Sequence, residues 1–466
     1  MILVGYISIF LYIFFLIFAL GPLIQKRSNL ETSRKVIHIL LFGVWVMLDA
    51  FLRGTIHMIL IPVTFIILNL LSRKFNIYRS VERQGENHMG TVYFAIAVTA
   101  VMIAAYCFPK MYYESGVAVF CLTFGDGFAA LVGYNTHSRP IRENKTLNGF
   151  LSCFLASTVA IFVFGLIYCP ELSLGISICL GIMTAILELA NYGLDNYTVT
   201  LGMFVVSYYL LHHPNTLIGV VIAEMIFLIV FFSHAIDYCG SLLSIVVVYT
   251  FYYCGGITGL SILLLEYFSI FCIGLYKKHN TSGKKTHSPR NLRQIAINGG
   301  LATIIMILYR IFDQPRLFII ALIAVSGCFV DSVASDVGTL SKKPPFDFIK
   351  GKVVSAGISG GITLLGTAAA LTASISLALI LSHYTALSNS FLFVMLVMGQ
   401  MFLDSVLGST LQVKYFCNTC GLVTEKKECC GAPTVYYSGL NWFDNNLVNL
   451  FSSTITVTIA FLVIGW

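Results

Sequence analysis

The stretch FGDGFAALVGYNTHSRPIRENKTLNG, residues 124–149, places Asp126 in an apolar run and follows it with glycines, arginines and a Lys-Thr pair. The run itself, 116–134, is long enough to cross a hydrocarbon core of about 30 Å. Composition points the same way, because 58% of the residues are hydrophobic and 11% are charged, with a mean hydropathy of +0.87. An average soluble domain carries about 25% charged residues. The sequence therefore predicts an all-α, polytopic transmembrane protein.

Apolar runs of this kind recur along the whole chain between short polar loops. We expect about sixteen transmembrane helices in two bundles. The first run is kept as a span, because it lacks the basic region and the small-residue cleavage site of a signal peptide. The expected helices cover residues 2–20, 36–52, 56–71, 91–108, 116–134, 151–169, 175–190, 199–212, 216–233, 240–254, 257–276, 295–309, 317–337, 353–381, 390–413 and 450–466.

The basic residues support this number of helices. If the N-terminus lies outside and every run crosses, 24 of the 28 Lys and Arg residues fall on the inner side, as the positive-inside rule requires. The net charge of +7 is then mainly a topology signal. No loop interleaves aromatic residues with a contiguous basic patch, so nucleic acid is not an expected partner. The densest basic loop, 277–293, is expected to be a cytoplasmic linker near anionic lipid.

The two halves of the chain carry similar motifs. FGDGFAALVG (124–133) and FVDSVASDVG (329–338) share Phe, Asp, Ala, Val and Gly at the same offsets. A lysine lies nineteen residues after the aspartate in both, at Lys145 and at Lys350. A third segment, FLDSVLGS (402–409), begins in the same way. Common ancestry or convergent site design is the favoured explanation of these matches, with chance as the alternative in an apolar sequence. We expect two membrane domains, 1–235 and 240–466.

Acidic residues near helix ends mark the candidate site of the first half. Asp126, Glu188 and Asp195 lie toward the inner ends of apolar runs, together with Asn196 and Lys145. Ionisable groups in such places are costly and are functional candidates, although a carboxylate paired with a nearby lysine is the alternative for each. Carboxylate and amide oxygens suit Mg²⁺, a lysine neutralises polyphosphate, and glycines allow close approach to phosphate. This combination predicts phosphoryl or nucleotidyl transfer without a Walker or protein-kinase motif.

This region resembles the phytol kinase and dolichol kinase family of membrane enzymes, which is related to the phosphatidate cytidylyltransferases. The resemblance covers about residues 1–212 and implies transfer of a phosphoryl group from CTP to a long-chain isoprenoid alcohol. The spacing between Gly133 and Lys145 departs from the family. The matching residues are Arg34, Lys35, His38, Gly90, Thr91, Val92, Tyr93, Gly125, Asp126, Ala129, Gly133, Lys145, Thr146, Gly149, Glu188, Asp195 and Asn196.

The second half carries its own polar set. The glycines of SAGISGGITLLGT (355–367) either approach phosphate or allow close helix packing. The stretch WFDNNLVNLFSS (442–453) opens the last helix with four oxygen-bearing side chains, which echo the Asp195-Asn196 pair. The candidate residues are Asp331, Asp336, Lys350, Lys352, Gly357, Gly360, Gly361, Asp404, Asp444, Asn445, Asn446 and Asn449.

These residues resemble the phytyl-phosphate kinase family over about 240–466. Asp336 stands where a glutamate is expected, so the charge is kept. The implied reaction adds a second phosphate to a prenyl monophosphate. The remaining matches are Ser335, Gly338, Gly408, Gln412 and the loop with Cys417 and Cys420.

Together the halves predict a two-step isoprenoid kinase with both sites on the cytoplasmic side. We expect Mg²⁺, CTP or another nucleoside triphosphate, the prenol and its monophosphate, and the bilayer as partners. Asp126, Glu188, Asp195 and Asn196 would position Mg²⁺ and the nucleotide, and Lys145 would bind the triphosphate. In the second site, Lys350 or Lys352 would bind phosphate. His38 is a candidate base or a core histidine. Synthesis of a CDP-lipid and a lipid or ion transporter are the alternatives.

Four cysteines share the polar loop FCNTCGLVTEKKECCG, 416–431. A Cys-x-x-Cys pair followed by Gly is typical of a zinc knuckle. The second pair is irregular, because adjacent cysteines rarely bind one ion. Structural zinc and free thiols both remain open for Cys417, Cys420, Cys429 and Cys430.

Overall fold

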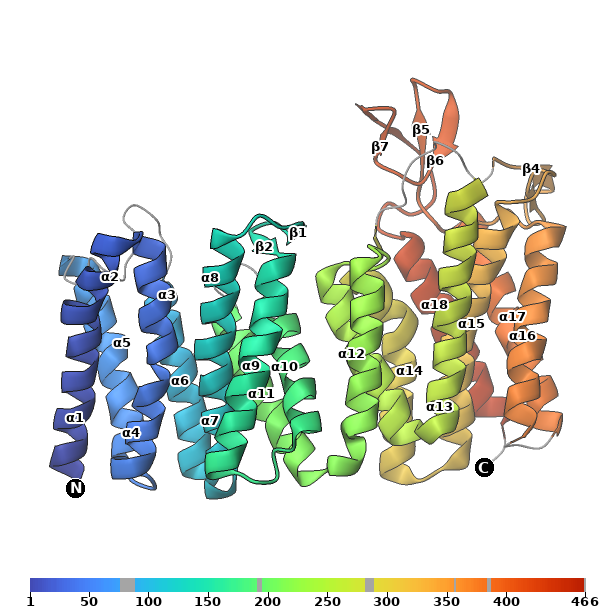
Figure 1. Cartoon of the computed structure of the whole chain (residues 1–466). Coiled ribbons are helices and arrows are strands. Elements are labelled where there is room, and N and C mark those ends of the chain that lie inside the picture. The colour runs from blue at the N-terminus through green and yellow to red at the C-terminus, as the bar shows by residue number, and fades with distance from the viewer. Residues whose placement is uncertain (76–88, 191–194, 281–288, 356–357, 384–386, 465–466) are drawn as a thin grey trace. The chain divides into compact units, whose positions relative to one another are not determined.

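The computed structural model describes residues 1–75, 89–190, 195–280, 289–355, 358–383 and 387–464 (Figure 1). These residues form helices joined by short loops, with a few small antiparallel hairpins. Within them, thirteen spans are long and apolar enough to cross a membrane. Many of their large hydrophobic side chains are exposed on the surface of the protein, as expected for contact with lipid. The prediction of an all-α membrane protein is confirmed.

The sixteen predicted runs map onto these spans in a simple way. The runs 175–190 and 199–212 form α10 (Leu174–Glu188) and α11 (Asp195–His212), which are not among the thirteen. The runs 240–254 and 257–276 belong to α13 (Tyr238–Asn280), whose backbone leaves helical geometry at Gly256 with φ 62° and ψ −160°. The run from 353 becomes helical only at Leu364, because a glycine-containing loop precedes it.

The chain divides into two compact units, Met1–Glu224 and Met225–Trp466. The first unit contains the following elements before α12 (Leu217–Phe232), which crosses the boundary: α1 (Ile2–Phe14), η1 (Phe15–Leu20), α2 (Gly21–Arg27), α3 (Leu30–Leu40), α4 (Phe42–Leu52), α5 (His57–Phe75), α6 (Gly90–Cys107), η2 (Pro109–Met111), α7 (Tyr112–Phe120), η3 (Cys121–Asp126), α8 (Gly127–Asn135), β1 (Pro140–Arg142), β2 (Lys145–Thr146), α9 (Leu147–Tyr168), α10, α11 and η4 (Pro214–Thr216).

The second unit continues with α13 and ends with the C-terminal helix. Its remaining elements are α14 (Leu292–Phe312), α15 (Pro315–Gly338), β3 (Phe346–Asp347), β4 (Lys352–Val353), α16 (Leu364–Ser382), α17 (Leu387–Thr410), β5 (Lys414–Cys417), β6 (Leu422–Thr424), β7 (Glu428–Cys429), β8 (Ala432–Pro433), β9 (Val435–Ser438) and α18 (Asn445–Val463).

In each unit, the span that carries the repeated aspartate motif is the most buried one. Of the residues in the most apolar part of the span Pro109–Asn135, 67% are buried, and the value for Pro315–Gly338 is 78%. The core beside the first of these spans is aromatic, with Trp45 packed on Phe120 and Phe164. Trp45 Nε1 donates to Ser115 Oγ at 3.1 Å. The motif aspartates therefore sit on central helices rather than on the lipid-facing surface.

A local structure that follows the motif repeats in both units. After α8, the β1–β2 hairpin leads to Thr146, whose side chain caps α9 by accepting from Gly149 N at 3.2 Å. After α15, the chain returns to Thr363, which caps α16 by accepting from Gly366 N at 3.1 Å. The two caps belong to TLNG (146–149) and TLLG (363–366), a second repeated motif.

The helix before each cap packs on it through a glycine. A Cβ on Gly133 would lie 3.0 Å from Thr146 Oγ1, and a Cβ on Gly338 would lie 3.0 Å from Thr363 Oγ1. The residue before each threonine also pairs with the preceding strand: Lys145 pairs with Arg142, and Ile362 bridges to Phe346. The structure thus places Ile362, rather than Lys350, at the position equivalent to Lys145.

Candidate active site

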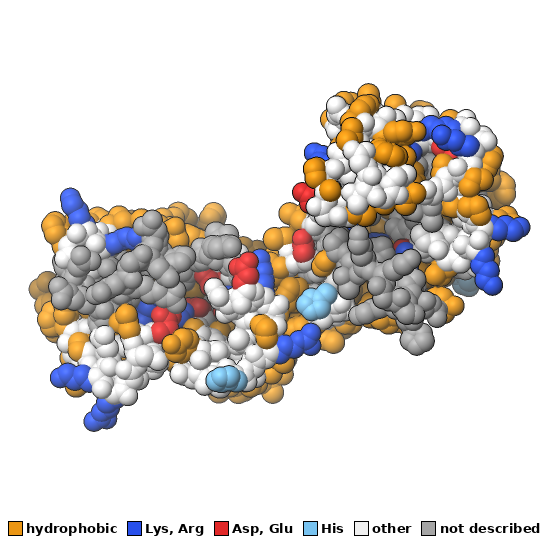
Figure 2. All heavy atoms as spheres, turned by 90° about the horizontal axis from the view of Figure 1, so that it is seen from above, with side chains coloured by type: hydrophobic (Ala, Val, Ile, Leu, Met, Phe, Trp, Pro, Cys, Tyr) orange, Lys and Arg blue, Asp and Glu red, His pale blue; other side chains and the backbone are white. Residues whose placement is uncertain are grey.

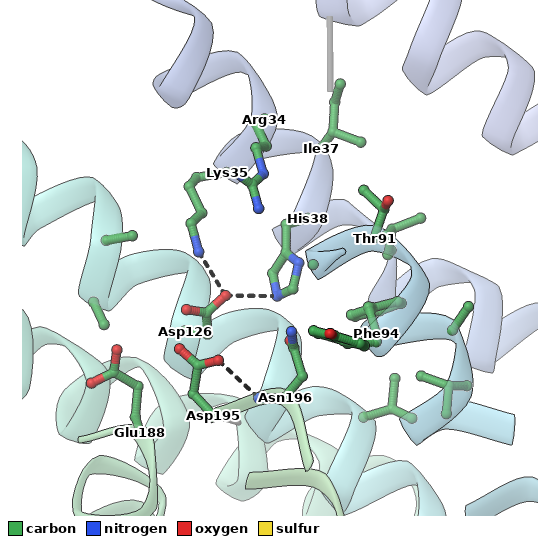
Figure 3. Close-up of a pocket in the computed structure, with 18 of the residues that line it drawn as sticks. Arg34, Lys35, Ile37, His38, Thr91, Phe94, Asp126, Glu188, Asp195 and Asn196 are labelled. Carbon is green, nitrogen blue, oxygen red and sulfur yellow. Dashed lines mark hydrogen bonds and ion pairs between the residues drawn. The ribbon is translucent and has the colours of Figure 1, made fainter. Parts of the chain in front are cut away.

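Asp126 lies at the end of η3, a short π-helix between α7 and α8. Single π-helical turns inside α-helices are frequent at functional sites. The aspartate is 7% exposed, and two side chains of α3 point at it (Figure 3). Lys35 Nζ donates to Asp126 Oδ2 at 2.7 Å, and His38 Nε2 lies 3.2 Å from the same oxygen. The carboxylate therefore has a half-buried cation beside it.

Lys145 joins two further acids to this cluster. Its ammonium forms an ion pair with Glu188 and lies 3.2 Å from Asp195 Oδ2. The N-terminus of α11 orients Asp195, because Asn196 N donates to Asp195 Oδ1 at 3.0 Å. Burial lowers the pKa of Lys145, but Glu188 and Asp195 raise it more, so the pKa stays above its usual range. Lys145 is therefore a permanent cation at physiological pH.

The three carboxylates form a group of the kind that holds a metal ion. Each of Asp126, Glu188 and Asp195 offers an oxygen, and these oxygens lie within 4.8 Å of one another. Counted as formal charges, the three carboxylates exceed Lys35 and Lys145 by one negative charge. Oxygen ligands and residual negative charge fit Mg²⁺, which is held in proteins by one or two carboxylates together with substrate phosphates.

A cavity of about 950 Å³ connects this cluster to apolar surroundings. Its polar part includes Arg34, Lys35, Asn69 and the three acids, whereas its apolar part lies between α1, α4 and α5. A second, apolar pocket of about 360 Å³ shares part of this lining. The site therefore suits a ligand with a polar head and a long apolar tail. The apolar lining residues include Ile13, Ile17, Trp45, Leu48, Ile61 and Phe65.

The hairpin end of this unit is visible from above in Figure 2. Acidic and basic side chains appear close together on this face, while hydrophobic side chains form its edge. Charged side chains of both signs thus gather on this face of the unit.

The glycines and Thr146 of the first motif mainly set the helix packing around the site. Gly125 faces Ser157 and Thr184, and a Cβ there would lie 2.7 Å from Ser157 Oγ. Gly133 and Gly149 bring α8 and α9 together beneath the Thr146 cap, and both also line the cavity with Thr146. A Cβ on Gly149 would lie 2.9 Å from Ala129 O. Their small size is therefore explained without a bound nucleotide.

Two residues of the candidate site could not be identified from the pattern of acidic residues alone. Lys35 and His38 were matched only through the family resemblance, although their i, i+3 spacing in SRKVIH places them on one helix face. Arg142 had no assigned role, yet its Nη1 donates to Leu189 O at 2.6 Å and ties the hairpin to the end of α10. Only the hairpin geometry reveals that contact.

In the second unit, the candidate acids fall into separate polar contacts. Asp404, on α17, is 9% exposed and accepts from Ser452 Oγ at 3.3 Å. With the Asn449 amide nitrogen turned toward it, Asn449 also donates to Asp404 Oδ2 at 2.9 Å. Asp331 lies on central helix α15. Among the described residues, these acids do not form a close carboxylate group like that of the first unit.

Basic residues accompany the other two acids. Lys277 Nζ donates to Asp336 Oδ1 at 2.9 Å. Arg293 Nη1 donates to Asp444 Oδ2 at 2.8 Å, and Asp444 caps α18 by accepting from Leu447 N at 3.1 Å. Asn445 and Asn446 occupy the first turn of α18. In the second unit, the cations that pair with these two acids therefore come from α13 and α14. In the first unit, by contrast, Lys145 directly precedes the Thr146 cap.

The predicted phosphate residues of this unit lie in and beside the β3–β4 hairpin. Lys350 is in the hairpin turn, where its backbone N donates to Asp347 Oδ1 at 3.0 Å, and Lys352 pairs across from Asp347. Asp347 is 1% exposed and also accepts from Ser409 Oγ at 2.6 Å. Gly360 has φ 91° and Gly361 packs against Val354 and Pro345. Gly357 lies outside the described residues.

The fold and this amphipathic site define an integral membrane protein. Residues 221–457 match the model of the family described as "Integral membrane protein DUF92". This match covers slightly more than half of the chain, and the protein belongs to that family. It is 30% identical to Protein PGR of Arabidopsis thaliana over 201 residues, which cover 37% of this chain and 68% of the relative. No solved structure matches the chain.

Proposed function

We propose that the protein phosphorylates an isoprenoid alcohol at the first-unit site and converts the monophosphate to the diphosphate at the second. The donor would be CTP or another nucleoside triphosphate. The observation that supports this most directly is the cavity itself. Three carboxylates and two lysines line its polar part, and apolar side chains that could surround a lipid chain line the rest. A phytol- or polyprenol-type alcohol has a matching reactive head and apolar chain.

The first reaction would transfer the γ-phosphoryl group in line. The alcohol oxygen forms a bond to the γ-phosphorus, and the bond to the β–γ bridging oxygen breaks, which releases the nucleoside diphosphate. Asp126, Glu188 and Asp195 would hold Mg²⁺, which supplies charge neutralisation on the phosphates when bound. Lys35 and Lys145 would exchange their carboxylate partners for phosphate oxygens, to which a lysine binds as a point charge.

In this proposal, His38 would receive the proton of the alcohol. Its Nε2 lies 3.1 Å from Leu122 O and 3.2 Å from Asp126 Oδ2, both of which are acceptors. The imidazole therefore carries its proton on Nε2 and presents Nδ1 as an acceptor. Because His38 lines the cavity, Nδ1 would take the hydroxyl proton as the new bond forms.

The second step is proposed for the acids of the second unit. The repeated aspartate motif and the repeated Thr cap place Asp331 and Asp336 on a helix equivalent to that of Asp126. Lys277 and Arg293 provide cations next to Asp336 and Asp444. The basic loops favour a cytoplasmic position for both sites, where nucleoside triphosphates are found.

The test uses the purified full chain in mixed micelles with geranylgeraniol, Mg²⁺ and CTP labelled in its γ-phosphate. We expect labelled monophosphate followed by diphosphate, and Asp331→Asn should stop the reaction at the monophosphate. Release of pyrophosphate with a CDP-lipid product would instead identify a cytidylyltransferase. No labelled lipid with CTP, ATP, GTP or UTP would overturn the kinase proposal.

A further inference from the structure

The cysteine ribbon, residues 414–438, consists of strands β5 to β9 in the second unit (Figure 1). Strand β5 pairs with both β6 and β9, and β7 pairs with β8 in a separate hairpin. Each hairpin turn carries two cysteines. Cys417 ends β5 opposite Leu422 and precedes Cys420 in the turn. Cys429 ends β7 opposite Ala432 and precedes Cys430.

The four thiols converge on one point. All four sulfur atoms lie within 4.8 Å of one another. The Sγ atoms of Cys420 and Cys429 are 3.9 Å apart, and those of Cys429 and Cys430 are 3.8 Å apart. Sulfurs bound tetrahedrally to zinc at about 2.3 Å are separated by about 3.8 Å, whereas a disulfide requires about 2 Å. The spacing fits a shared ion and not a disulfide.

The backbone explains how adjacent cysteines can reach the same ion. Cys430 and Gly431 form the two-residue turn between β7 and β8 and both have positive φ, 53° and 75°. Such turns favour Asn or Gly, and a cysteine with positive φ is uncommon. The strained turn rotates the Cys430 side chain relative to that of Cys429, so both thiols face the first hairpin.

We propose that Cys417, Cys420, Cys429 and Cys430 bind one zinc ion that fixes the ribbon against the turn at Ser359 and Gly360. Two residues of the ribbon form hydrogen bonds with the backbone of this turn. Glu425, directly after β6, accepts from Ser359 N at 2.6 Å. Lys414, the first residue of β5, is 4% exposed and donates its Nζ to Ser359 O at 2.9 Å.

The turn at Ser359 and Gly360 also contacts two helices of the second unit. Ser359 Oγ donates to Asn445 Oδ1 at 3.4 Å, at the start of α18. A Cβ on Gly360 would lie 2.6 Å from Ser409 Cβ, near the end of α17. Zinc would therefore hold a turn that adjoins the Asp444–Asn446 segment. This inference concerns metal binding and local order, so it holds whether or not the second unit transfers phosphate.

The first test measures metal in the full chain, purified under reducing conditions after growth with zinc. Elemental analysis should find about one zinc per chain, and Cys420→Ser with Cys429→Ser should remove most of it. Cys272→Ser, at an exposed cysteine of α13, is the matched control and should keep the ion. Exchange with Co²⁺ should give the visible absorption of a tetrahedral thiolate site. A metal content equal to that of the double variant would overturn the proposal, as would a disulfide within this set found by mass analysis.

The second test begins with the unmodified protein, so that misfolding of a variant cannot decide the effect of zinc removal. Removal of zinc by a chelator should increase amide hydrogen exchange in a peptide containing Ser359, and readdition of zinc should reverse the change. Glu425→Ala should keep the zinc and still increase exchange at Ser359, with α16 unchanged as the internal control. Protection at Ser359 that is insensitive to both changes would overturn the role as a brace.

Discussion

Lys35 Nζ lies 2.7 Å from Asp126 Oδ2 across 91 residues of sequence, and the two side chains are only 12% and 10% exposed. The contact joins α3 to the π-helical turn that ends at Asp126. It therefore links an N-terminal helix to the carboxylate cluster, and each of the two side chains is an ion-pair partner of the other.

Because of this link, Asp126→Asn and Lys35→Met should have non-additive effects. We expect each variant to reduce formation of the prenyl monophosphate by about 100-fold or more, and the double variant to lose little beyond the more severe single change. Rates of labelled lipid formation measure this directly. Glu171→Gln, at an exposed acid outside the cavity, is the control with unchanged activity. Strictly multiplicative losses would contradict the coupling.

Lys145 and Ile362 precede equivalent helix caps and allow a paired comparison. Lys145→Ala should reduce monophosphate formation by about 100-fold and raise the KM for the nucleotide, because a half-buried cation is lost next to the proposed phosphate position. Ile362→Ala should change diphosphate formation from a supplied prenyl monophosphate by less than about threefold, because no cation is removed. Steady-state kinetics with each lipid substrate test both expectations. Equal losses would show that the residue before the cap serves packing alone.

The apolar part of the cavity should control the length of the accepted alcohol. Leu48 is 1% exposed and lines the cavity, so Leu48→Ala should shift the ratio of kcat/KM values toward longer prenols. The change should also cost about 2–5 kcal/mol of stability. Leu322→Ala, at a fully buried residue of α15, should carry a similar cost without altering chain-length preference. Competition between two prenols, resolved by mass, provides the measurement.

The repeated caps should be sensitive to small additions. A Cβ on Gly366 would meet the backbone oxygen of Ala334, so Gly366→Ala should destabilise the second unit by about 1–3 kcal/mol. Gly149→Ala, facing Ala129 O, should act in the same way in the first unit. Gly274→Ala, which meets no atom within 4 Å, is the control. Thermal unfolding in detergent should show a lower Tm for the first two variants only.

Much of the fold could be predicted from apolar length alone. The boundary between the runs 240–254 and 257–276 coincides with the positive-φ Gly256, because a glycine between two apolar runs also interrupts the sequence pattern. The merging of these runs into one element depends on packing and could not be derived from hydropathy.

The residues of the candidate site could be predicted where acids and a lysine stood out against an apolar background, as at Asp126, Glu188 and Lys145. The prediction failed where it relied on equal spacing between an aspartate and a lysine to identify equivalent positions in the two halves. Lys350 follows Asp331 by the same number of residues that separates Lys145 from Asp126, but it lies in a hairpin turn. The TLNG and TLLG motifs carry the correct alignment. Asp347 gave no signal, because an acid in a polar loop reveals its burial only after folding.

The apolar pocket that adjoins the main cavity shares Ile13, Ile17 and Phe65 with it. If a lipid alcohol arrives through this lining, it never passes through water. Turnover would then follow the mole fraction of the alcohol within the membrane or micelle, and not its amount per volume of solution. If the proposed kinase activity is present, adding inert detergent at constant alcohol should slow it by surface dilution, while adding buffer alone should leave it nearly unchanged.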